Sequence, residues 1–162
     1  MAKFTPAEAA SAVALHQLIM DWGHELDMNG GLSIAGILTP DCHYLVGGTA
    51  YDGPDAVTGF YTARGERVKN LQKDGVRTQR HAISNLRVAF KSPTEASVTF
   101  LIVNYSNEGK PPILNLVGPT IVADCQMDCR EEADGHWRIS LFDSQPRFVG
   151  NDPFLNASVV KS

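Results

Sequence analysis

Apolar side chains in the N-terminal part of the chain recur at the spacing of an α-helix. The residues that share one face at 3.6 residues per turn are Leu15, Leu18, Ile19, Trp22 and Leu26. Thr5 suits the N-cap, because Pro6 follows at the first helical position and Glu8 completes a capping box. The pair Gly30-Gly31 favours the end of this helix. The pattern therefore predicts a helix that begins at Pro6 and buries one side.

Shorter elements are expected between residues 32 and 71. A second helix is predicted over residues 32–38, where Thr39-Pro40 ends it. Residues 43–47 favour a strand, and Gly47-Gly48 favours a turn. Asp52-Gly53-Pro54 then begins a third helix that runs to about Leu71.

The pattern changes to β-strands after Gly75. Turn residues separate four β-rich segments, which are 77–90, 95–106, 113–130 and 136–149. Short sequential connections favour an antiparallel meander. Helices followed by strands predict one α+β domain over residues 1–162, with N-terminal helices packed on a curved, mostly antiparallel sheet.

Alternation along two of these segments predicts which side chains face the interior. One face of the first segment carries His81, Ile83, Asn85, Arg87 and Ala89. Such a mixed face suits a polar cavity or a subunit contact. In the last segment, Asp143 and Arg147 continue the core-facing register of Trp137, provided that no bulge intervenes.

Composition and charge exclude several classes of protein. Of the 162 residues, 43% are hydrophobic and 20% are charged, which argues against disorder and fibrous structure. The formal net charge of -4 and the lack of a basic stretch argue against a nucleic-acid partner. No apolar leader and no run of about 18 apolar residues is present, so we expect a cytoplasmic protein without a membrane partner.

Metal, disulfide and nucleotide chemistry lack sequence support. Cys125 and Cys129 would lie about 13 Å apart along a strand, too far to bridge, so reduced thiols are expected. Neither they nor Cys42-His43 have zinc-module spacing. The glycine-rich nucleotide signatures and the serine-hydrolase motif G-x-S-x-G are absent. We expect no metal and no cofactor.

Asp27 and His81 are the candidate acid and base. A carboxylate in the last turn of a helix is disfavoured by the helix dipole, which hints at a purpose other than helix stability. A carboxylate beside an imidazole would fix its tautomer and raise its basicity. From position alone, however, each is more often a solvated or structural residue, and the sequence does not show that they meet.

The order of several motifs resembles the SnoaL-like branch of the nuclear-transport-factor-2-like superfamily. The stretches that carry the resemblance are Trp22–Asp27, Tyr51–Val57, Arg77–Asn85 and Ala133–Ile139. The resemblance as a whole covers the chain from about residue 6 to 150, and the arrangement is most similar to scytalone dehydratase, hexachlorocyclohexane dehydrochlorinase and bile-acid 7α-dehydratase. The resemblance implies a cone-shaped α+β barrel with one deep, mostly apolar pocket.

The same resemblance implies a set of site residues. It assigns the catalytic Asp–His pair to Asp27 and His81, acting without a cofactor. Pocket positions for substrate binding fall at or near Trp22, Tyr44 and Arg147, and Asn104 lies where some relatives have a second histidine. It also implies a homo-oligomer, with a trimer preferred and a dimer as the alternative.

Three functions remain open at this point. The first is a cofactor-independent lyase that dehydrates or deformylates a small cyclic or aromatic compound, one version being lignin-derived diaryl compounds. The second is an isomerase or cyclase in the same pocket. The third is a non-catalytic subunit like the β subunit of ring-hydroxylating dioxygenases, which predicts that Asp27 and His81 do not meet. The tail, residues 151–162, would either close the pocket or reach a neighbouring subunit.

Overall fold

The structure is a computed structural model that describes residues 4–114 and 118–159. Its helices are α1 (Pro6–Asn29), η1 (Ile34–Ile37), α2 (Pro54–Leu71), η2 (Lys73–Gly75) and α3 (Pro153–Val159). Its strands are β1 (Leu38–Val46), β2 (Thr49–Asp52), β3 (Arg77–Ser92), β4 (Glu95–Glu108), β5 (Ile121–Glu131) and β6 (Trp137–Val149).

Helix α1 has the predicted start, end and buried face. The Thr5 hydroxyl accepts a hydrogen bond from the Glu8 backbone, and the Glu8 carboxylate accepts one from the Thr5 backbone, at 3.2 and 2.7 Å. Gly30 ends the helix in the left-handed conformation, at a φ of 66°. All five residues predicted for the apolar face are buried. This part of the prediction is confirmed.

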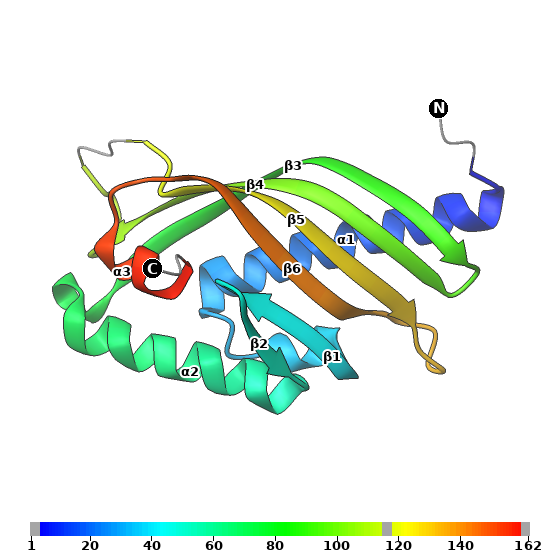
Figure 1. The fold of residues 1–162 in the computed structure, drawn as a ribbon, viewed down its shortest axis with the longest axis horizontal. Helices are drawn as coiled ribbons and strands as arrows, with labels where there is room; N and C mark the ends of the chain where they lie inside the picture. The colour runs from blue at the N-terminus through cyan, green and yellow to red at the C-terminus, as the bar shows by residue number, and fades with distance from the viewer. Residues whose placement is uncertain (1–3, 115–117, 160–162) are drawn as a thin grey trace.

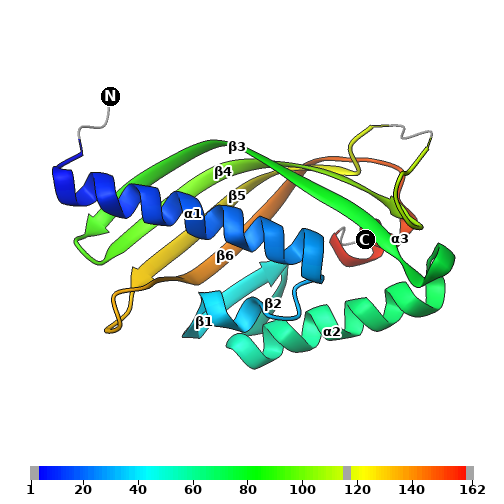
Figure 2. The same ribbon diagram turned by 180° about the vertical axis from the view of Figure 1, so that it is seen from behind.

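The strands form one open, curved sheet in the order β2-β1-β6-β5-β4-β3. Strands β3 to β6 make the predicted antiparallel meander, and β1 joins it parallel to β6. The sheet wraps around α1, and α2 runs below the end of α1 (Figures 1 and 2). The predicted fold, helices on a curved and mostly antiparallel sheet, is confirmed, although the sheet is not closed.

Residues 32–52 differ from the prediction. The helix expected over 32–38 is only the short 3₁₀ turn η1, and β1 begins already at Leu38. Pro40 therefore lies inside a strand. It is tolerated because the register is interrupted between Leu38 and His43, so a missing N–H costs no ladder hydrogen bond there. The short strand β2 was not predicted.

The segment predicted as a strand over 113–130 is shorter in the structure. Strand β5 begins only at Ile121, and residues 113–114 have no regular structure. Residues 115–117, which fall within the predicted strand, lie outside the described residues.

Two bulges change which side chains face the interior. In β3 the register shifts between Ser84 and Arg87, where Asn85 has a φ of 56°, so Arg87 faces solvent and Leu86 packs on the core. The predicted alternation holds for His81 and Ile83 and is wrong beyond them. A second shift, between Asp128 and Cys129, lies opposite Leu141 and Ile139 of β6.

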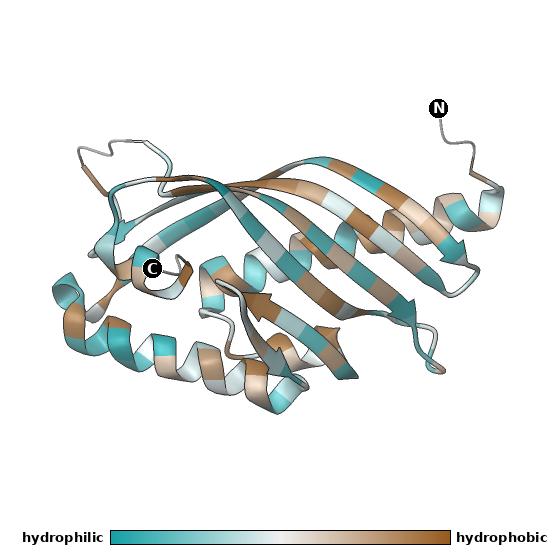
Figure 3. Cartoon of the chain, in the orientation of Figure 1, coloured by the Kyte–Doolittle hydropathy of each residue, from teal (hydrophilic) through white to brown (hydrophobic). Residues whose placement is uncertain are grey.

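The core lies between the concave face of the sheet and the helices. Hydrophobic and hydrophilic residues alternate along β3 to β6, as Figure 3 shows. The three cysteines are buried and unpaired, as predicted. Within the described residues, none of the helices combines the length and hydropathy needed to span a bilayer.

Candidate active site

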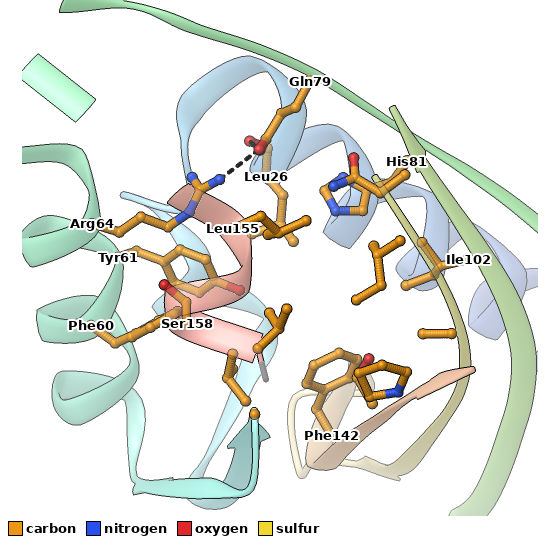
Figure 4. A pocket seen from close by; sticks show the side chains of 18 of the residues that line it. Leu26, Phe60, Tyr61, Arg64, Gln79, His81, Ile102, Phe142, Leu155 and Ser158 are labelled. Atoms are coloured by element: carbon orange, nitrogen blue, oxygen red, sulfur yellow. Dashed lines mark hydrogen bonds between the residues drawn. The ribbon is translucent and has the colours of Figure 1, made fainter. Parts of the chain in front are cut away.

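A cavity of about 110 Å³ lies between the sheet, α2 and α3. Its apolar walls come mainly from Trp22, Leu26, Phe60, Ile102, Phe142 and Leu155 (Figure 4). The polar side chains that reach it are few, namely Tyr61, Arg64, Gln79, His81, Asn104, Ser144 and Ser158. One water molecule needs only about 10–15 Å³ of such a cavity. The cavity therefore has room for a small ring compound.

Asp27 and His81 meet at the edge of this cavity. The carboxylate of Asp27 accepts two hydrogen bonds from His81, one from the backbone N–H at 2.9 Å and one from ring Nδ1 at 2.6 Å. The two side chains are only 10% and 13% exposed. Helix α1 supplies the carboxylate from its last turn, and β3 supplies the imidazole.

This contact fixes the chemical form of the imidazole. A carboxylate only accepts hydrogen bonds, so Nδ1 carries the proton and Nε2 is left as the basic nitrogen. His81 lines the cavity, and Asp27 lies behind it. The arrangement can therefore take a proton from a bound molecule. The non-catalytic alternative predicted that these side chains do not meet, and on this point it is wrong.

A chain of hydrogen bonds runs from Trp22 to Tyr61. The indole N–H of Trp22 donates to the Tyr44 hydroxyl at 2.9 Å, and the hydroxyls of Tyr44 and Tyr61 lie 2.8 Å apart. Tyr44 is fully buried and has no other hydrogen-bond partner among the described residues, so its proton goes to the oxygen of Tyr61. Tyr61 can then donate its own hydroxyl proton to a molecule bound in the cavity.

Burial keeps both tyrosines protonated. It raises the pKa of Tyr61 to about 12 and that of Tyr44 well above its usual range. Tyr61 is therefore a neutral hydrogen-bond donor across the physiological pH range. It is suited to stabilise negative charge on an oxygen atom in the cavity.

Asn104 lies beside the histidine on the next strand. It is the register partner of His81 between β3 and β4, and it lines the cavity. The side chain is 2% exposed, and its oxygen has no hydrogen-bond partner within the described ranges. A buried amide with unused hydrogen-bonding capacity is suited to hold a polar group of a ligand.

Five of the six residues singled out from the sequence lie together. Trp22, His81 and Asn104 line the cavity, and Asp27 and Tyr44 are each one hydrogen bond behind a lining residue.

Arg147 is the exception. Its Nε donates to Asp124 Oδ2 at 2.6 Å, and the two side chains are 53% and 58% exposed. The expectation that Asp143 and Arg147 continue the core-facing register is wrong, because β6 leaves that register near Leu141 and buries Phe142 instead.

The sequence analysis missed the cavity residues of α2, whereas it gave closure of the pocket by the tail as one of two alternatives. Val57, Tyr61 and Arg64 follow one another at helical spacing, which was the available signal for a common face on α2. Helix α3 contributes Leu155 and Ser158 to the lining, so the tail closes one side of the pocket.

Metal ligation has no structural support in the part of the chain that the structure describes. No group of three or more His, Cys, Asp or Glu side chains is placed to hold an ion there. Cys42 is buried in the core, and His43 pairs with Asp52 on the surface.

Comparison with known proteins supports the fold. No family model matches the chain, and no curated protein matches it by sequence. A Novosphingobium aromaticivorans protein provisionally named a scytalone dehydratase is similar in structure, with a TM-score of 0.73, 18% identity and 92% coverage of both chains.

Two further structures are similar at comparable levels. Hexachlorocyclohexane dehydrochlorinase LinA-type3 of Novosphingobium barchaimii has a TM-score of 0.68 and 20% identity, covering 89% of this chain and 91% of its own. ActVI-ORFA of Streptomyces coelicolor has a TM-score of 0.70 and 11% identity, covering 88% of this chain and 98% of its own. At these identities the likeness concerns the fold alone, and it confirms at that level the resemblance drawn from the motifs. The chain therefore has the SnoaL-like, nuclear-transport-factor-2-like fold.

Proposed function

We propose that the chain is a lyase that needs no cofactor and removes water, or a similar small leaving group, from a small cyclic or aromatic substrate. The observation that carries the proposal is the Asp27–His81 pair, in which the carboxylate holds Nδ1 of an imidazole that lines an apolar cavity. The fold is shared with the named dehydratase and dehydrochlorinase structures, which supports this reaction class over others.

Each side chain has a role that follows from its position. His81 Nε2 takes a proton from the carbon next to a carbonyl, and the C–H electrons form a double bond as the hydroxyl on the next carbon leaves. The imidazolium returns its proton to that hydroxyl, which departs as water. Asp27 holds the ring and stabilises the imidazolium, and the Tyr61 hydroxyl donates to the carbonyl oxygen as its charge grows.

The apolar walls add to the effect of these groups. General-base catalysis alone supplies about 10²–10⁴-fold, so the remaining acceleration must come from positioning and from fixed donors in a site with little water. Trp22 and Phe142 pack against each other, with ring centroids 5.1 Å apart, and form one aromatic wall of the cavity, which favours an apolar ring as substrate.

Proton transfer by the pair can be tested before the substrate is known. We expect the protein to catalyse deuterium exchange at the α-carbon of a ring ketone such as 2-tetralone in D₂O, followed by NMR. His81→Gln should lower the rate by at least about 100-fold, and Asp27→Asn by at least about tenfold. His43→Gln is a matched control, since His43 forms an Asp–His contact of the same 2.6 Å length on the surface.

A mass-spectrometric screen of cyclic and aromatic alcohols then defines the reaction. Products lighter by one water support a lyase, and products of unchanged mass support the isomerase or cyclase alternative. Folded His81→Gln protein with undiminished exchange and turnover would exclude the proposed role of the pair.

A further inference from the structure

Arg64 places an unpaired positive charge on the cavity. It lies one helical turn after Tyr61 on the inner side of α2, and its guanidinium faces the interior across from His81 (Figure 4). The side chain is partly buried. Burial also lowers the pKa of Arg64, which means that the charged form is held there at a cost.

The partner of Arg64 in the protein is a neutral amide. Its Nη2 donates to Gln79 Oε1 at 2.7 Å. The amide nitrogen of Gln79 donates in turn to the Leu26 carbonyl at 2.7 Å, so the Gln79 oxygen is held toward Arg64. No carboxylate among the residues that the structure describes lies within ion-pair distance of Arg64.

The surroundings of Arg64 are rich in positive charge. Arg77 forms an ion pair with Asp152, whose side chain is 11% exposed. Arg67 donates to the Ser158 hydroxyl, and the guanidiniums of Arg67 and Arg77 each lie 4.8 Å from the ring of Phe154. Asp152 is thus already engaged by Arg77, and Arg64 retains N–H groups for a ligand.

We propose that Arg64 binds the carboxylate of a ring carboxylic acid while His81 faces a C–H group of the same molecule. The inference rests on the proposed function and narrows its substrate class. A guanidinium matches a carboxylate with two parallel hydrogen bonds, and the apolar surface of Leu26, Ile102 and Phe142 separates the two polar ends. Gln79 acts as a positioning residue that holds the guanidinium in place.

Binding of two isosteric probes tests the charge requirement. Calorimetric titration of the intact protein should show 2-naphthoate bound at least about tenfold more tightly than 2-naphthamide, which has the same shape without the charge. Arg64→Met should reduce this preference to within about threefold. Arg147→Met is the matched control, because Arg147 is paired with Asp124 on the surface, and it should leave the preference unchanged.

The outcomes separate this inference from the proposed function. Equal affinity for acid and amide in the unaltered protein, or a preference that survives in Arg64→Met protein with an unchanged melting temperature, would overturn the carboxylate site. Displacement of naphthoate by inorganic phosphate at equal concentration would assign the site to free anions and overturn the ring-acid assignment. His81→Gln should still bind naphthoate, so loss of exchange activity and loss of binding are independent results.

Discussion

Asp27 occupies a position that is unfavourable for its own helix. A carboxylate in the last turn of α1 faces the negative end of the helix dipole. The two hydrogen bonds from His81 offset this cost, because a charged acceptor makes each of them stronger than a neutral pair. The two carboxylate oxygens of Asp27 thus accept hydrogen bonds from the backbone and from the ring of His81. Together these bonds restrict both the position and the rotation of the imidazole.

Tyr61 and Tyr44 differ in what their hydroxyls reach, and this gives a prediction. Tyr61→Phe removes the donor to the cavity, so the exchange rate of the ring ketone should fall about 10–100-fold. It also leaves the Tyr44 proton without an acceptor, which should lower the free energy of unfolding by about 1–3 kcal/mol. NMR exchange and urea unfolding measure the two effects.

Tyr44→Phe is the comparison for this prediction. The change leaves the Trp22 indole without an acceptor and should destabilise the protein by a similar amount, about 1–3 kcal/mol. Because Tyr61 keeps its hydroxyl, the rate should fall much less than in Tyr61→Phe. A larger rate loss in Tyr44→Phe than in Tyr61→Phe would contradict the assignment of the cavity proton to Tyr61.

Helix α3 can close the cavity because a glycine in the turn between β1 and β2 lets the helix pack closely against that turn. Gly47 has a φ of 55°, and a Cβ atom there would lie 2.3 Å from the Ser158 carbonyl oxygen. A side chain at this position cannot coexist with α3 in its observed place. The contact therefore couples the β1–β2 turn to the wall formed by Leu155 and Ser158.

Gly47→Ala should release α3 from the cavity. The strained φ and the overlap together should lower stability by at least about 1 kcal/mol, and 2-naphthoate affinity should fall. Limited proteolysis should cut residues 150–159 faster than in the unaltered protein. Gly36→Ala is the control, because a Cβ there meets no atom within 4 Å. Equal cleavage rates in the two variants would show that α3 does not depend on this approach.

Local signals explain which elements could be predicted. Helix α1 has a capping box and a periodic apolar face within its own sequence, and α2 begins with Gly53 and Pro54. Strand β2 pairs with β1 across the two-residue turn Gly47-Gly48, so a local signal for it was available, whereas the bulge at Asn85 depends on pairing with β4, which no local pattern encodes. The pairing of Asp27 with His81 spans 54 positions and came from family resemblance, while Arg64 needed the packing of α2 against the sheet.

The open sheet gives the whole molecule one concave side, which holds the helices and the cavity, and one outer side (Figure 2). The expected homotrimer, or homodimer, stays a prediction. The interior also contains weak acids of unusually high pKa. Burial raises the pKa of Cys125, Cys129 and Tyr61 to about 12, and all three lie between the sheet and the helices or within the sheet itself.

These groups predict a loss of stability at alkaline pH. Their ordinary pKa values are 9.0 for the thiols and 10.0 for the phenol, so the unfolded chain loses these protons first as the pH rises. The folded state binds more protons between about pH 9 and 12, and the free energy of unfolding therefore falls with rising pH in that window. Below about pH 9 the three groups are protonated in both states, and their full contribution to the free energy of unfolding is present. Each group steepens the fall by up to about 1.4 kcal/mol per pH unit.

Urea unfolding at several pH values from about 8 to 11 measures this slope. The double change Cys125→Ala and Cys129→Ala should flatten it, because two of the groups no longer titrate, although the absolute stability falls through lost packing. Tyr61→Phe should flatten only the part above about pH 10. The packing loss lowers the stability equally at every pH and leaves the slope unaffected, so an unchanged slope in the double variant would mean that the thiols titrate alike in the folded and unfolded chains.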